Sequence, residues 1–423
     1  MVTYKVYVEI EGVQTEVGII EGQDYYDARF LYSQSYMIRP NAKPISISLP
    51  FQNDYFSASQ TKSFFDGLLP EGFTRRAVSE WLNFDDRDYL SILYSLGREC
   101  IGAIQIAKDN ENLPERYVEI NKKKIKELAS EGTSKSTELV TKAHLSLTGA
   151  SGKVGLYFDK INQKWYLPEG LAPSTHIVKQ SHIRYQNIVT NEQLTLLTAK
   201  ECGIDIPDSF IINVGNGKDS EVLFATERFD RLFNEKSSVI DGLRKPFRLH
   251  QEDFSQAMGI SSTNKYEPEG ANYLREMFEI IRKYSSNPLE DQIKLWDRIV
   301  FNYLTGNTDA HIKNYSLLYG YDMQSIRLAP AYDMLSTVIY EGTSNEMSFG
   351  IGKEKNLKKI NRESFAISAS EIGITEKTAL KHFDNMCNKF ESALRKSADQ
   401  LTDTGFQNAK IISEKILKNR SWR

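Results

Sequence analysis

The sequence predicts an α+β fold, with strands gathered in the first half of the chain and helices in the second. Apolar and polar residues alternate over 4–10 and again over 13–20, as in a β-hairpin. A second pair of strand-like runs spans 210–214 and 221–231, around a Gly-Asn-Gly turn. In the second half, apolar residues recur every three or four positions, which is typical of amphipathic helices.

The composition is that of an ordinary folded protein. Of 423 residues, 40% are hydrophobic and 26% are charged, so the chain can bury a large core in about two or three domains. The net charge of −3 gives no general attraction for nucleic acid or an anionic membrane. Cys100, Cys202 and Cys387 form no C-x-x-C pair, which argues against a zinc site or a disulfide framework.

The chain carries no pattern of a membrane or secreted protein. No apolar run approaches the roughly 18 residues that a membrane span needs. Residues 1–8 alternate like a strand and lack a signal-peptide core. We therefore expect a cytoplasmic protein with no membrane contact.

The first hundred residues predict a small α+β domain without catalytic residues. After the hairpin, the alternating run 45–49 is typical of another strand. Helical stretches follow at 73–82 and 89–96, and 102–106 closes the domain as a strand. The charged segment 107–140 that comes next favours a solvated helix and a linker, and a contact with an acidic partner is the alternative.

A glycine-containing segment then lies between two strand-like stretches. Its Gly149-Ala150-Ser151-Gly152-Lys153 run could lay backbone N–H groups against a phosphate, because no bulky side chain blocks the approach. The spacing does not match a Walker A loop and fits the lid of a protein kinase better. A simple hairpin is the alternative.

A turn at 165–168 is expected before the short strand His176–Lys179. Lys179 has the position of a phosphate-binding strand lysine, or it is a strand-end surface residue. Asn191-Glu192 opens a helix, where Glu192 either pairs with Lys179 or serves the helix dipole. Strand 221–231 has the place of an adenine-binding hinge, at Glu227 and Phe229.

The second half reads as helices at 250–258, 273–284, 376–396 and 407–417. A further helix carries an apolar stripe that we expect to lie in the core. The stripe consists of Leu289, Ile293, Trp296, Ile299 and Tyr303.

That stripe leads into the segment on which the functional reading rests. Asp309 and Asn314 are five positions apart, and Asp333 follows nineteen positions later. Protein kinases use D-x-x-x-x-N in this way: the Asp accepts the proton of the substrate hydroxyl and the Asn holds a magnesium ion. A later Asp binds the magnesium that bridges the phosphates. The order here is the same, and it predicts one cleft shared with Lys179.

These residues, taken together, resemble the HipA-type Ser/Thr protein kinases, which are the toxins of bacterial toxin–antitoxin pairs. The resemblance runs over almost the whole chain. It is carried by Leu68-Leu69-Pro70-Glu71-Gly72, Ser146-Leu147-Thr148-Gly149-Ala150, His176–Lys179, Asn191-Glu192, Glu227–Arg231, Gln251-Glu252-Asp253, Asn307-Thr308-Asp309 with His311 and Lys313-Asn314, and Tyr332-Asp333.

The resemblance implies a two-lobed, protein-kinase-like fold. An N-terminal subdomain (1–107) would be fused to a small lobe (108–232), followed by a mainly helical C-terminal lobe (233–423). It implies ATP and Mg²⁺, with Asp309 as catalytic base, Asn314 and Asp333 as metal ligands and Lys179 on the phosphates. The expected nucleotide contacts are Gly149, Ala150, Ser151, Gly152, Lys153, Lys179, Glu227, Phe229, His311, Asn314 and Asp333.

The resemblance also implies regulation and partners. Ser146 falls where family members phosphorylate themselves and switch off, and Ser151 is a second candidate because it stands where a Gln is expected. A dimeric helix-turn-helix antitoxin would bind the kinase and bring it to operator DNA. The implied substrate is an aminoacyl-tRNA synthetase. A lipid or small-molecule kinase, and a pseudokinase that only completes an antitoxin–operator complex, remain alternatives.

Overall fold

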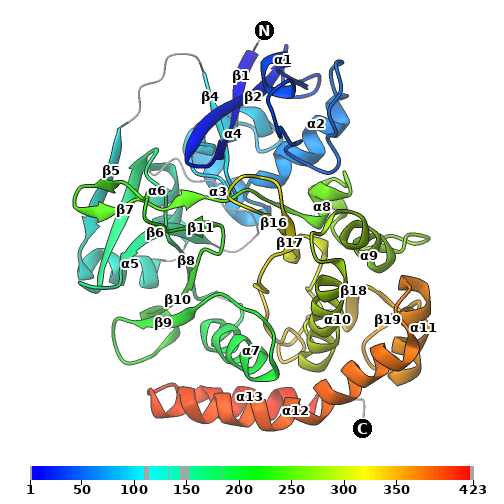
Figure 1. Cartoon of the computed structure of the whole chain (residues 1–423). Coiled ribbons are helices and arrows are strands. Elements are labelled where there is room, and N and C mark those ends of the chain that lie inside the picture. Colours follow the sequence, from blue (N-terminus) through cyan, green and yellow to red (C-terminus); the bar gives the residue numbers. More distant parts are fainter. Residues whose placement is uncertain (1, 109–113, 132, 143–151, 183, 420–423) are drawn as a thin grey trace. The chain divides into compact units, whose positions relative to one another are not determined.

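The computed structural model describes residues 2–108, 114–131, 133–142, 152–182 and 184–419 (Figure 1). The chain divides into two compact units. Unit 1 consists of Met1–His182, Ile212–Ser262 and Leu318–Ile326, and unit 2 of Ile183–Ile211, Thr263–Leu317 and Arg327–Arg423.

Unit 1 begins with a four-stranded antiparallel sheet in the order β3-β2-β1-β4. The strands are β1 (Val2–Ile10), β2 (Val13–Gly22), β3 (Arg29–Tyr32) and β4 (Ile104–Ala107). The predicted hairpin is confirmed. Its turn residues, Glu11 and Gly12, both have positive φ (50° and 79°), as the tight turns that match strand twist require.

The helices α1 (Gln34–Met37), α2 (Ala58–Phe65), α3 (Gly72–Leu82) and α4 (Tyr89–Leu96) complete this region. The predictions for α3 and α4 are confirmed. The prediction of a strand at 45–49 is wrong, because the backbone N–H groups of this segment form hydrogen bonds with side chains of unit 1 and not with a neighbouring strand. Ile45 N–H donates to the Tyr32 hydroxyl (2.9 Å), and Ile47 N–H donates to Glu252 (3.1 Å).

The second sheet of unit 1 has the order β5-β7-β6-β8-β10-β9. Its strands are β5 (Glu115–Ile120), β6 (Lys153–Asp159), β7 (Lys164–Gly170), β8 (His176–Gln180), β9 (Ser209–Asn213) and β10 (Val222–Glu227). Two expectations are corrected. In the segment 107–140 the predicted helix is confirmed as α5 (Lys122–Glu131), but the predicted linker also contains β5 and α6 (Thr133–Lys142), and the predicted turn at 165–168 lies inside β7. Pro168 is tolerated there because the pairing of β6 with β7 ends at Tyr166.

Short strands follow: β11 (Arg231–Leu232), β12 (Val239–Ile240), β13 (Leu243–Arg244), β14 (Phe247–Arg248) and β15 (Gln251–Asp253). The helix predicted at 250–258 is only α8 (Phe254–Ala257). It starts late because the Asp253 side chain accepts from Gln256 N–H (2.9 Å), so Asp253 ends β15 and caps the helix.

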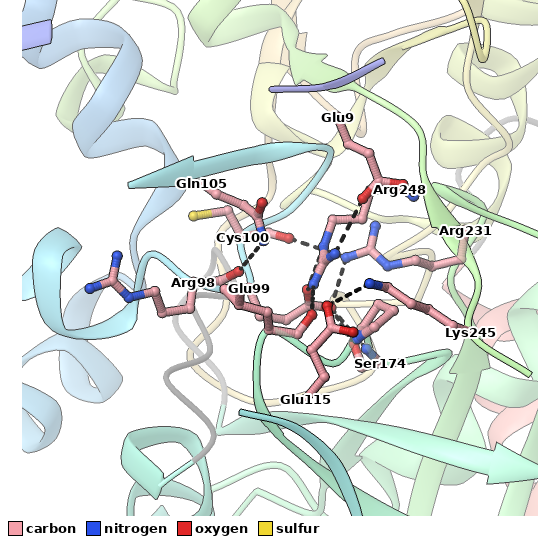
Figure 2. Close-up of polar contacts among 12 residues, drawn as sticks. Glu9, Arg98, Glu99, Cys100, Gln105, Glu115, Ser174, Arg231, Lys245 and Arg248 are labelled. Carbon is pink, nitrogen blue, oxygen red and sulfur yellow. Dashed lines mark hydrogen bonds and ion pairs between the residues drawn. The ribbon is translucent and has the colours of Figure 1, made fainter. Parts of the chain in front are cut away.

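A buried cluster of six charged residues connects β1 with the segments around residues 99, 228–231 and 248 of unit 1; Figure 2 labels Glu9, Glu99, Arg231 and Arg248 of this cluster. Its members are Glu9, Glu99, Arg228, Asp230, Arg231 and Arg248, so three cations balance three anions. Glu99 accepts from all three arginines and from Ser174 N–H (2.9 Å). Burial alone would raise the pKa of Glu99, but the three guanidinium groups outweigh it and hold that pKa well below its usual range.

Unit 2 is mainly helical, with α7 (Ile188–Cys202), α9 (Tyr273–Tyr284), α10 (Pro288–Thr305), α11 (Arg362–Ile372), α12 (Glu376–Asp403) and α13 (Asn408–Lys418). α12 packs against α7, α10, α11 and α13, and Figure 1 shows it beside α13. Two hairpin strands, β18 (Glu346–Ile351) and β19 (Glu354–Asn356), belong to this unit. The chain passes between the units along β16 (Ser316–Tyr319) and β17 (Ile326–Leu328).

The core of unit 2 confirms most of the predicted apolar stripe on α10. Trp296, Ile299 and Tyr303 are fully buried, and the Trp296 and Tyr303 rings both pack edge-on against Phe365. Ile293 is partly buried, and Leu289 is 78% exposed in the first turn of the helix. No helix among the described residues is long and apolar enough to cross a membrane.

Candidate active site

The candidate catalytic loop starts where α10 ends, at Gly306. This residue caps the helix in the left-handed conformation (φ 67°). A Cβ at this position would lie 2.4 Å from the Val338 side chain, so a residue without a side chain is needed both for the backbone angle and for the space. The loop from 306 to 314 therefore leaves the helix in one defined direction.

Asn307 holds the loop in shape with its side chain. Its Oδ1 accepts from Asp309 N–H (3.3 Å), and its Nδ2 donates to Asn302 Oδ1 (3.0 Å) on α10. The same Nδ2 makes a longer hydrogen bond to the backbone oxygen of Asp333 (3.4 Å). One buried amide thus connects the segment that carries Asp309 with the segment that carries Asp333.

The predicted pair Asp309 and Asn314 lies together. Asn314 Nδ2 donates to the backbone oxygen of Asp309 (2.9 Å), which also accepts from His311 N–H (2.8 Å). The intervening Ile312 and Lys313 are buried, whereas Asp309 is exposed. The loop therefore presents the Asp309 carboxylate at the surface of unit 2, above a buried turn.

Asp333 has a backbone conformation that is unusual for a residue with a side chain, with φ at 54°. Its neighbour Tyr332 fixes the position: the Tyr332 hydroxyl donates to the backbone oxygen of Lys313 (3.0 Å) and lies 2.5 Å from Ser316 Oγ. Strained conformations of this kind persist where surrounding contacts over-determine them, and they cluster at functional sites.

Asn191 supports the segment after Asp333, a role that the sequence did not suggest. Its Nδ2 donates to Ser336 O (2.8 Å) and its Oδ1 accepts from Ser336 N–H (3.2 Å). The prediction that Asn191 opens this helix is wrong, because α7 already begins at Ile188. No local pattern signals this contact, because Ser336 lies 145 positions from Asn191 in the sequence.

The helix that leads into the loop, α10, carries a buried arginine. Arg298 on α10 is 2% exposed, and its side-chain nitrogens have no hydrogen-bond partner among the described residues. Burial lowers its pKa to about 10, against the opposing effect of Asp205. Buried charge without a partner is costly, so Arg298 marks a weak point of this core.

Lys179 lies in unit 1, in the middle of the second sheet. It is 8% exposed, and its Nζ lies 5.5 Å from the centre of the Phe224 ring. Its partner on β6 is Lys153, and residues directly opposite in an antiparallel pair share a face. Both lysines are buried (8% and 9% exposed), and an anion such as phosphate bound beside them would offset their like charges.

The remaining predicted positions are distributed as follows. Gly152 precedes β6, and a Cβ there would lie 2.0 Å from Gln180 Nε2. Glu227 ends β10 and pairs with Lys160 (2.8 Å), and Phe229 is partly buried. Ser146, Gly149, Ala150 and Ser151 lie outside the described residues. The cleft shared by Lys179 and Asp333 stays a prediction.

The oxygen atoms of Asn314 and Asp333 suit a hard cation such as Mg²⁺, which prefers carboxylate and amide oxygens together with phosphate. Because Asn314 Nδ2 is engaged by the Asp309 backbone, the amide oxygen is the atom turned away from that contact. Among the described residues, no group of three or more His, Cys, Asp or Glu side chains could hold a metal alone.

Comparison with known proteins identifies the family. Residues 8–107 match the HipA N-terminal domain, and residues 145–394 match the HipA-like C-terminal domain. Y4mE of Sinorhizobium fredii, described as a candidate kinase, is 30% identical over 93% of this chain and 92% of its own length. The serine/threonine-protein kinase toxin HipA of Shewanella oneidensis is 26% identical over 83% and 80% of the two chains.

A solved structure of Shewanella oneidensis HipA with HipB and operator DNA has the same fold. It superposes with a TM-score of 0.80 and 22% identity, over 98% of this chain and 96% of that chain. The fold is therefore of the α+β, kinase-like class that the sequence predicted. With both domain matches and relatives over nearly its full length, this chain belongs to the HipA family of protein kinases.

Proposed function

We propose that this chain transfers the γ-phosphate of ATP to a Ser or Thr hydroxyl of a protein, with Asp309 as the catalytic base. Asp309 accepts the proton of the substrate hydroxyl, and Lys179 with Lys153 offsets phosphate charge. Asn314 and Asp333 would hold Mg²⁺, which would supply positive charge to offset the phosphate charge.

One observation carries the proposal: the loop that presents Asp309 is locked to both predicted metal ligands by hydrogen bonds. Asn314 bonds to the backbone of Asp309, and Asn307 bonds to the backbone of Asp333. Phosphoryl transfer depends chiefly on positioning and electrostatics, so a rigid arrangement of these three residues is what the reaction requires.

We further propose that the chain is the toxin of a toxin–antitoxin pair. The Shewanella oneidensis relative is a kinase toxin, and the solved structure of that protein contains HipB and operator DNA. A dimeric helix-turn-helix antitoxin would bind this chain and bring it to its operator. The substrate would be an aminoacyl-tRNA synthetase, and autophosphorylation at Ser146, or else Ser151, would switch the kinase off by adding charge where triphosphate binds.

Labelling with radioactive ATP tests the enzymatic proposal. Wild-type protein should label itself and protein targets in a lysate only when Mg²⁺ is present, and Asp309→Asn should abolish labelling. ATP with Mg²⁺ should still raise the melting temperature of Asp309→Asn, since that carboxylate is assigned to the base and not to the nucleotide. Undiminished labelling by Asp309→Asn would refute the assignment of the base.

The partner proposal has a separate test. Co-expression with the helix-turn-helix protein of a neighbouring reading frame should yield a complex that binds operator DNA, while this chain alone should not bind that DNA. Phosphosite mapping of the labelled lysate should identify the substrate, and mapping of the purified kinase should find Ser146 or Ser151. Labelling of lipid alone would favour a lipid kinase instead.

A further inference from the structure

A tyrosine outside the predicted motifs contacts the candidate base. The Tyr266 hydroxyl donates to Asp309 Oδ1 at 2.5 Å, across forty-three positions of sequence. This distance is typical of a short, charge-assisted O–H···O⁻ bond. The Tyr266 ring also packs edge-on against His311, with 5.4 Å between ring centres.

Although Tyr266 is 48% exposed, the backbone that carries it is well anchored. The next residue, Glu267, is 7% exposed in its side chain and accepts from Tyr273 N–H and Gly350 N–H, both at 2.8 Å. Lys355 forms an ion pair with the same carboxylate at 3.4 Å. Tyr266 is therefore held beside Asp309 by α9 and by the β18–β19 hairpin, and it is not a loose surface side chain.

One residue of β18 sets the spacing between the two partners. The backbone oxygen of Ser348 accepts from Glu267 N–H (2.9 Å), and the Ser348 hydroxyl donates to the backbone oxygen of Thr308 (2.8 Å). Glu267 follows Tyr266 directly, and Thr308 precedes Asp309 directly. Both sides of the Tyr266–Asp309 contact are thus fastened to the same serine.

We propose that Tyr266 is a positioning residue for phosphoryl transfer, which fixes the rotamer of Asp309 through its hydroxyl. This inference rests on the proposed role of Asp309 as the base. A carboxylate held through Oδ1 turns its second oxygen in one direction, ready to accept the proton of a substrate hydroxyl. A donor to the carboxylate weakens it as a base, but a reaction governed by geometry gains more from a fixed orientation.

Tyr266→Phe tests the hydroxyl alone, because it keeps the ring that packs on His311. We expect kcat for protein phosphorylation to fall about tenfold to a hundredfold, the worth of one hydrogen bond to a charged group. KM for ATP and the melting-temperature rise with ATP and Mg²⁺ should not change. A purely structural role would instead lower the melting temperature or change KM along with kcat.

Two further variants sharpen the test. Ser348→Ala keeps the backbone hydrogen bond to Glu267 and loses only the hydroxyl's hydrogen bond to Thr308. Like Tyr266→Phe, it should lower kcat. Tyr284→Phe, which removes a hydroxyl from the end of α9, should behave like wild type.

The outcomes separate the inference from the function on which it rests. If wild type labels and Tyr266→Phe labels equally fast, the inference is wrong. If Tyr266→Phe is faster, the hydroxyl competes with substrate instead of positioning the base, which also overturns it. If wild type fails to label any protein, the proposed function falls first and the inference falls with it.

Discussion

The Asn191 side chain forms hydrogen bonds with both backbone groups of Ser336: it accepts from the N–H and donates to the carbonyl oxygen. Ser336 lies three residues after Asp333, the candidate metal ligand with a positive φ. The two hydrogen bonds therefore hold the segment that carries Asp333 in place. A side chain of α7 thus supports the proposed metal site without being one of its ligands.

Asn191→Ala should weaken Mg²⁺ binding. Supporting residues around a metal ligand are typically worth about 10–100-fold in metal affinity, so we expect the Mg²⁺ concentration for half-maximal labelling to rise by roughly tenfold. Titration of Mg²⁺ at saturating ATP measures this. The matched control is Gln193→Ala on the same helix, α7. It loses a hydrogen bond to the backbone oxygen of Ser209 on β9 and should leave the Mg²⁺ requirement unchanged.

Gly306→Ala should impair both stability and activity. A left-handed alanine costs about 1 kcal/mol, and here its Cβ would also press on Val338 and displace the loop that carries Asp309. Gly203 also caps a helix, α7, in the left-handed region (φ 93°), but the added Cβ of Gly203→Ala would meet nothing within 4 Å. Both variants should lower the urea midpoint, but only Gly306→Ala should also lower kcat. Equal kcat values in the two variants would contradict the proposed role of the loop geometry.

Two buried arginines should respond oppositely to the same substitution. Arg228→Met leaves Glu99 and Asp230 with one cation too few and should lower the free energy of unfolding by about 3–5 kcal/mol. Arg298→Met removes a charge that has no hydrogen-bond partner among the described residues, and should raise it by about 1–3 kcal/mol. Urea unfolding at neutral pH measures both. Arg87→Met, at an exposed ion pair, should leave the midpoint unchanged.

Glu252 should make stability depend on pH. Burial raises its pKa from 4.5 to about 7, against the hydroxyls of Ser46 and Tyr319 that donate to it. Between these two values the folded chain binds a proton that the unfolded chain has lost, so stability from this group is fully present below about pH 4.5 and is lost as pH rises through 7.

The measurement is the free energy of unfolding of wild type and Glu252→Gln from pH 5 to 8. The amide stays neutral throughout, so wild type should lose about 3 kcal/mol relative to the variant over this range. Parallel pH curves for the two proteins would show that the carboxyl does not titrate in this window.

Local sequence patterns were sufficient to predict an element where its backbone hydrogen bonds form within the segment itself. The hairpin of β1 and β2 and the helices α3, α4 and α9 were predicted at nearly their observed bounds, since periodicity and turn residues act within a few positions. The strand predicted from the alternating pattern at 45–49 did not form, because no strand among the described residues pairs with this segment. Partners from distant segments took those N–H groups instead.

For the charged motifs too, the sequence shows which residues are present but not which residues they contact. Arg228, Asp230 and Arg231 stand out in the sequence as part of a presumed hinge, but nothing local reveals that they are buried against Glu9 and Glu99. Tyr266 was missed for a related reason. A tyrosine in a polar loop carries no periodic signal, and its contact with Asp309 exists only because β18 holds both segments.

The sequence by itself determined the family, the fold class and the spacing of Asp309, Asn314 and Asp333, because these depend on residue order and short-range periodicity. Only the tertiary structure decided which side chains support them: Asn307 within the loop, Asn191 on Ser336 and Tyr266 beside Asp309. The physical reason is that a hydrogen bond between segments depends on packing that brings distant residues within about 3 Å, and no local pattern encodes that distance.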